Sequence, residues 1–128
     1  MDTSRLWHFL PLGYLLTVAI ETPVLLAGLA PRHPLRRRLL AGLWLTACTY
    51  PFVVLVLPVI FDGASRAAYI LTAEVFAPAA ECALFLTAFP SRRDDAPSTR
   101  LRDCAAITTA NLASFVAGEL LAARGWLV

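Results

Sequence analysis

Two carboxylates, Glu74 and Glu81, interrupt an apolar stretch that runs from Tyr69 to Phe89 and is long enough to cross a bilayer. Their spacing of seven residues is close to two helical turns, so both side chains leave the same face of one helix. An ionised acid in hydrocarbon is costly, and acids inside membrane spans usually mark functional sites. The pair therefore indicates a site for protons or metal cations.

Two further acids, Glu21 and Glu119, lie in other apolar stretches, and Asn111 precedes Glu119 in the last one. Counted from one end of the predicted spans, three polar residues lie about eight or nine positions deep, or roughly 12 to 14 Å. These three, Glu21, Glu81 and Asn111, are predicted to form an inner site. Glu74 and Glu119 lie nearer the opposite ends and are predicted to form an outer site. The supporting polar residues are predicted to be Tyr14, Thr17, Thr49, Tyr50 and Thr108.

The charge state of these acids defines the chemistry that they can do. No arginine falls inside the predicted spans, so each acid must be protonated, share a proton, coordinate a cation or reach water. Carboxylates are ligands for hard cations, which makes a divalent metal ion on Glu21 and Glu81 a candidate cofactor. The competing interpretation is structural, because protonated Glu and Asn can also act as hydrogen-bonding glue between helices.

The composition identifies an integral membrane protein and excludes several functions. Hydrophobic residues make up 59% of the 128 residues, and the mean hydropathy is +0.68. All eleven basic residues are arginine, so lysine Schiff-base chemistry and a P-loop are excluded. The net charge of +2 is small and the arginines all lie outside the predicted spans, so nucleic acid is not an expected partner. No Ser-His-Asp, Cys-His or zinc-protease motif is present, so nothing in the sequence predicts an enzyme.

The apolar stretches predict a single transmembrane domain over residues 1–128, with helices at about 6–30, 39–61, 67–89 and 103–123. This is an all-α, four-helix bundle built from two αα-hairpins. The loops 31–38 and 90–102 carry eight of the eleven arginines. The positive-inside rule therefore predicts that both loops are cytoplasmic and both termini are outside, in a membrane that we expect to be the bacterial inner membrane.

These observations predict a small transporter or channel for protons or a divalent cation. The alternative is an accessory or assembly subunit of a larger membrane complex, in which the acids and Asn111 only hold the helices together. Four helices enclose little room for a solute path. Besides membrane lipid, we therefore expect the partners to be further copies of the chain or a larger membrane complex.

Overall fold

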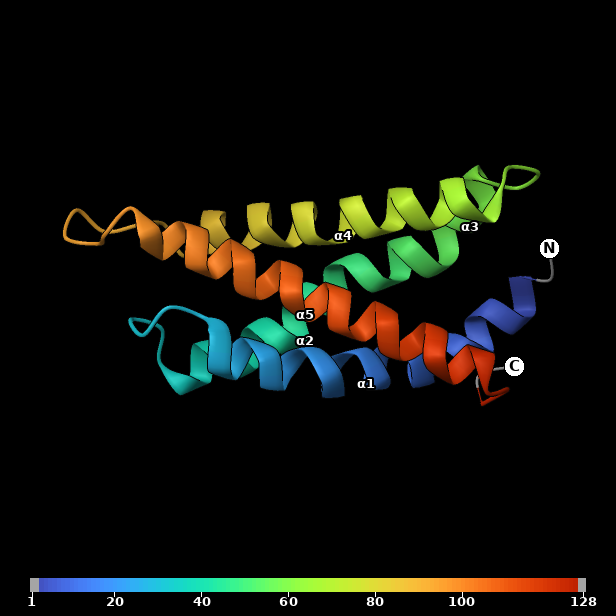
Figure 1. Cartoon of the computed structure of the whole chain (residues 1–128), viewed down its shortest axis with the longest axis horizontal. Coiled ribbons are helices and arrows are strands. Elements are labelled where there is room, and N and C mark those ends of the chain that lie inside the picture. The colour runs from blue at the N-terminus through green and yellow to red at the C-terminus, as the bar shows by residue number, and fades with distance from the viewer. Residues whose placement is uncertain (1–2, 127–128) are drawn as a thin grey trace.

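The chain folds as an all-α bundle, and the computed structural model describes residues 3–126 (Figure 1). Within these residues, four helical segments are long and apolar enough to cross a membrane, which confirms the predicted four-helix bundle. The elements are α1 (Thr3–Gly28), α2 (Leu35–Pro51), the π-helical turn η1 (Phe52–Val56), α3 (Leu57–Ile60), α4 (Arg66–Ala88) and α5 (Ser98–Ala123). The segments α2, η1 and α3 together form the second span.

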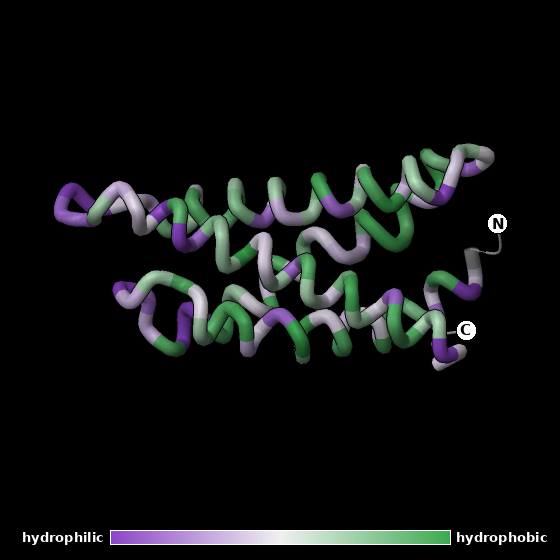
Figure 2. The backbone as a smooth tube through the Cα atoms, in the orientation of Figure 1, coloured by the Kyte–Doolittle hydropathy of each residue, from purple (hydrophilic) through white to green (hydrophobic). Residues whose placement is uncertain are grey.

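The closely packed helix pairs are α1 with α2, α2 with α4, α4 with α5, and α5 with α1. The order around the bundle is therefore α1, α2, α4, α5. The two arginine-rich loops lie at one end of the bundle, and the start of α1 and the end of α5 lie at the other (Figure 1). We call these the inner and the outer end. Hydrophilic residues gather in the inner loops, and isolated hydrophilic positions interrupt the apolar helices (Figure 2).

The largest differences from the predicted bounds are at the starts of the second and fourth spans. The second span begins at Leu35 rather than 39, and the fourth at Ser98 rather than 103. A proline occupies the N-cap position of each, Pro34 and Pro97. Proline is well tolerated there because its missing N–H would have no partner in the first helical turn. Arginines that the sequence assigned to the loops therefore lie in the first turns of these helices.

The second span is irregular next to Pro51. Proline has no N–H and its ring crowds the preceding turn, which disturbs the regular helical hydrogen bonds. The backbone widens into η1, where the Leu57 N–H donates to the carbonyl of Phe52, five residues earlier. Pro58 then follows in the first turn of α3. Single π-helical turns of this kind are frequent near functional sites.

The apolar core lies towards the inner end of the bundle. Its largest members are Leu25, Leu29, Leu45, Phe85 and Ile107, all at most 2% exposed. Helices approach closely where residues are small, as at Gly42, where an added Cβ would overlap the side chain of Thr22. The inner half of the bundle is therefore closed by close-packed apolar side chains.

Candidate functional site

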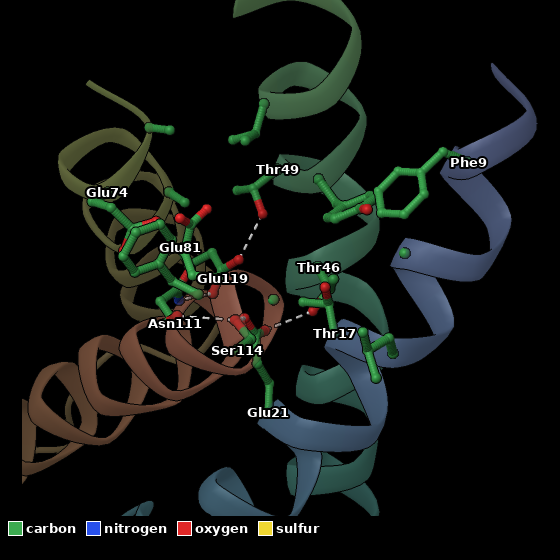
Figure 3. A pocket seen from close by; sticks show the side chains of 18 of the residues that line it. Phe9, Thr17, Glu21, Thr46, Thr49, Glu74, Glu81, Asn111, Ser114 and Glu119 are labelled. Atoms are coloured by element: carbon green, nitrogen blue, oxygen red, sulfur yellow. Dashed lines mark hydrogen bonds between the residues drawn. The ribbon is translucent and has the colours of Figure 1, made fainter. Parts of the chain in front are cut away.

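A cavity of about 310 Å³ lies between the four spans, on the outer side of the apolar core. All four intramembrane acids line it: Glu21 from α1, Glu74 and Glu81 from α4, and Glu119 from α5. Figure 3 shows these side chains around a common space, together with Asn111, Thr46, Thr49 and Ser114. The structure thus brings together acids that are as much as 98 residues apart in sequence, from Glu21 to Glu119.

Glu21 is 2% exposed and is held by two neighbouring helices. The Thr46 hydroxyl on α2 donates to its Oε2 at 2.9 Å. The Ser114 hydroxyl on α5 donates to its Oε1 at 2.7 Å. Both carboxyl oxygens of Glu21 therefore have a hydrogen-bond partner, and the residue links α1, α2 and α5 (Figure 3).

Glu81 has a parallel environment and is also 2% exposed. The Thr49 hydroxyl on α2 donates to its Oε1 at 2.6 Å. The side-chain amide of Asn111 on α5 donates to its Oε2 at 2.7 Å. Through these two hydrogen bonds Glu81 links α4 to both α2 and α5. Its partners Asn111 and Thr49 are themselves buried.

The hydroxyl partners allow each carboxyl to change its protonation state in place. The oxygens of Thr46, Thr49 and Ser114 also lie 2.9, 3.1 and 2.9 Å from the backbone carbonyls of Gly42, Leu45 and Asn111. A hydroxyl carries one proton and can also accept. When it donates to its carbonyl, the carboxyl can be protonated and donate to the hydroxyl. When it donates to the carboxylate, the acid is ionised. Both states use the same heavy-atom positions.

The two outer acids differ from each other. Glu74 is half-buried and lines the cavity. Glu119 forms a two-pronged ion pair with Arg66, with both carboxyl oxygens 2.8 Å from Nη2. The expectation that no basic group lies at the depth of these acids is therefore wrong for Glu119. Because α4 begins at Arg66, that arginine stands level with the last turns of α5, and its side chain is 70% exposed.

The predicted supporting residues divide between the cavity and the outside of the bundle. Thr17, Thr49 and Tyr50 line the cavity, but Tyr14 donates its hydroxyl to the carbonyl of Leu43 instead. Thr108 is exposed on the outside of α5. It precedes Asn111 by three residues, or about 60° on the helix, and this is enough to turn it off the cavity face.

Sequence reasoning missed Thr46 and Ser114 as partners of the inner acids. Each lies three residues from a polar residue that was predicted, Thr49 and Asn111 respectively. Positions three apart lie about 60° from each other on a helix, so this spacing was the available signal, but it does not distinguish Ser114 from Thr108, which lies three residues to the other side of Asn111.

A metal ion on Glu21 and Glu81 fits these residues poorly. Among residues 3–126 no group of three or more His, Cys, Asp or Glu side chains could hold a metal ion. A hydroxyl or amide donor also already points at each of the four carboxyl oxygens of these two residues. A cation would have to replace those donors, whereas a proton needs only one of the oxygens.

A second buried polar group, the inner-end clamp, consists of Ala30, His33 and Asp103. The carboxylate of Asp103 accepts from the Ala30 backbone N–H and from His33 Nε2, both at 2.8 Å. Arg37 Nη1 lies 3.2 Å from the other ring nitrogen of His33. A guanidinium can only donate, so Nδ1 accepts and Nε2 carries the proton. His33 and Asp103 lie 70 positions apart, and no spacing signal in the sequence joins them.

The hydrogen bond from Arg37 requires the neutral form of His33, and the surroundings of the ring favour that form. Burial lowers the pKa of His33, and the Asp103 carboxylate beside it opposes this effect only in part. The neighbouring guanidinium groups of Arg32 and Arg37 also disfavour a second positive charge. The hydrogen bonds of Asp103 tie the loop after α1 to the first turns of α5.

Together the fold and the site define a small α-helical protein with four spans of membrane-crossing length around an acid-lined cavity. No protein-family model, curated protein or solved structure matches the chain.

Proposed function

We propose that the protein moves protons across a membrane, either alone or coupled to a second solute. Glu21 and Glu81, with Asn111, form the inner proton-binding site, and Glu74 and Glu119 form the path towards the outer end. The observation that carries the proposal is the shared cavity, in which both inner acids are paired with hydroxyl groups that permit a protonated or an ionised carboxyl.

The closed inner half favours a gated transporter over an open pore. Leu25, Phe85 and Ile107 are at most 2% exposed and pack between the cavity and the inner loops. A proton held at Glu21 or Glu81 therefore needs a rearrangement of this core before it can leave at the inner end. The π-helical turn η1 is a local irregularity at which the second span can bend. It contains Val53 and closely follows Tyr50, and both residues line the cavity.

We place the protein in the bacterial inner membrane with the loops 31–38 and 90–102 in the cytoplasm. Their eight arginines support this orientation through the positive-inside rule. The cavity then lies on the side away from the cytoplasm. The small size of the bundle supports a homo-oligomer or a larger assembly as the working unit.

Proton flux into proteoliposomes, followed with an enclosed pH-sensitive dye, tests this proposal. The purified protein should acidify the lumen faster than empty vesicles under an imposed pH gradient and potential. Glu21→Gln and Glu81→Gln should each reduce that rate at least tenfold. Asp94→Asn, in the exposed third loop, makes the same chemical change outside the bundle and should leave the rate unchanged.

Two results would contradict the proposal. The first is the absence of any proton flux above that of empty vesicles. The second is an unchanged flux in both glutamine variants. A metal-sensitive dye in parallel vesicles tests whether the transported ion is a divalent cation instead. Flux of a divalent cation without proton flux would identify the metal ion, and not the proton, as the transported species.

The competing function is that of an accessory subunit of a larger membrane complex. It is favoured by one observation, that Glu21 and Glu81 bridge neighbouring helices through hydrogen bonds, as interhelical glue would. Purification from native membranes in mild detergent distinguishes the two functions. A stoichiometric large partner, together with unchanged flux in both glutamine variants, would identify the subunit.

A further inference from the structure

A second hollow lies on the outside of the bundle, in a groove between α2 and α4. Trp44 and Cys48 line it from α2, and Phe76, Ala80, Ala83 and Ala88 line it from α4. From Phe76 to Ala88 the groove follows α4 for roughly 18 Å, which is about the depth of one bilayer leaflet. No charged residue is among those that line it within residues 3–126.

An arginine lies close to the inner end of this groove, although it is not among the residues that line it. Arg37 precedes Trp44 by seven residues, so both lie on the same face of α2. Its guanidinium carbon lies 4.3 Å from the ring centre of Phe89, the residue directly after Ala88. A guanidinium has five N–H donors, and the contact with His33 uses one of them. The apolar groove thus ends at a cation that can still bind an anion.

We propose that this groove binds an anionic phospholipid, with an acyl chain along α4 and the phosphate on Arg37. The apolar lining suits the chain, and a planar guanidinium suits a phosphate, which it can bind through two parallel hydrogen bonds. A net negative headgroup is favoured because Arg37 keeps its positive charge in contacts with an imidazole and a phenyl ring, those of His33 and Phe89. The occupant is thus a lipid rather than a second copy of this chain.

The groove also adjoins the acid-lined cavity. Thr49 lines both hollows, and its hydroxyl holds Glu81. An acyl chain in the groove therefore packs against the turn of α2 that positions this carboxyl. Lipid binding rests on the groove and Arg37 alone, so it holds whether or not the protein moves protons.

Quenching of Trp44 fluorescence by brominated lipid tests the proposal, because Trp44 lines the groove. Trp7→Phe and Trp126→Phe together leave it as the only tryptophan. This protein is reconstituted in phosphatidylcholine vesicles that contain rising fractions of brominated phosphatidylglycerol or brominated phosphatidylcholine. Phosphatidylglycerol should reach half-maximal quenching at a mole fraction at least threefold lower. Arg37→Gln should abolish that difference.

Two further variants separate the headgroup from the acyl chain. Arg36→Gln removes a neighbouring, exposed arginine and should retain the preference. Ala83→Phe fills the groove from an exposed position and should weaken quenching by both lipids, with the far-UV circular dichroism unchanged. If Arg37→Gln fails to fold, Ala83→Phe still tests whether a lipid chain occupies the groove.

Three results would overturn the proposal. One is equal quenching by the two lipids, and another is an equal loss of preference in Arg36→Gln and Arg37→Gln, which would indicate a diffuse surface charge. The third is a Trp44 that neither lipid quenches, as expected if a second copy of the chain covers the groove.

Discussion

Replacement of Asp103 by Asn should destabilise the bundle, because the tautomer of His33 is fixed and one buried N–H group is left without a partner. Asp103 accepts two buried N–H groups, from Ala30 and from His33 Nε2. An Asn has one acceptor oxygen and presents N–H donors on the other side, so one of the two groups loses its partner. His33 cannot adapt by moving its proton to Nδ1, because that nitrogen faces the Arg37 guanidinium.

The magnitude follows from the count of unpaired groups. A buried N–H without a partner costs about 1–3 kcal/mol, so Asp103→Asn should lower the free energy of unfolding by about that amount. Asp103→Ala leaves both groups unpaired and should cost about 2–6 kcal/mol. In an Arg37→Gln background the proton of His33 can sit on Nδ1 and donate to the new side chain. The cost of Asp103→Asn should then fall by at least about 1 kcal/mol.

Equilibrium unfolding in mixed micelles, titrated with sodium dodecyl sulfate and followed by circular dichroism, measures these free energies. Asp94→Asn, an exposed acid in the preceding loop, is the matched control and should change stability by less than about 0.5 kcal/mol. Equal free energies of unfolding for Asp103→Asn and Asp94→Asn would contradict this explanation. So would a cost of Asp103→Asn that is the same in the Arg37→Gln background as in the wild type.

Three further predictions concern the rest of the bundle. Because burial lowers the pKa of His33, the unfolded chain binds a proton first, and stability should fall as pH drops below about 6.5. His33→Gln should flatten that dependence in unfolding free energies measured from pH 8 to 5. Gly42→Ala should cost about 1–3 kcal/mol because its Cβ overlaps Thr22, whereas Gly118→Ala, with open space around its Cβ, should melt no lower than wild type. Arg66→Gln removes only an exposed ion pair and should cost at most about 1 kcal/mol of unfolding free energy in the same micelles.

The spans of the bundle could be predicted because hydropathy and length decide them. A stretch such as Tyr69–Phe89 has few alternatives once its apolar length matches a bilayer. The helix starts were harder to predict from the sequence, because arginine is tolerated in a first helical turn at the membrane surface, where its long side chain reaches water. The prolines that precede Leu35 and Ser98 are the local signal that marks these starts.

The site could be predicted only as far as helical periodicity reaches. Spacing places Glu74 and Glu81 on one face, and depth brings Glu21 level with Glu81, which is consistent with their common cavity. Spacing does not give the rotation of one helix against its neighbour. That rotation turns Thr108 outwards and Ser114 inwards, so the hydroxyl partners of the acids depend on packing between helices.

Contacts between distant segments lay beyond a one-dimensional pattern. Arg66 and Glu119 pair across α4 and α5 because the two helix ends coincide in height. The clamp joins His33 to Asp103 across 70 positions, and its form depends on the loop after α1 folding back over the start of α5. The depth of a residue along its own helix does not indicate which residues of other helices or loops it contacts.

Infrared spectroscopy of the protonated carboxyl band reports directly on proton binding at Glu21 and Glu81. The wild-type protein in lipid should show a carboxylic acid C=O band that rises and falls reversibly with pH, and Glu81→Gln and Glu21→Gln should each remove part of it. A band that does not respond to pH, or that survives unchanged in both variants, would contradict proton binding at these acids and leave them as hydrogen-bonded links between helices.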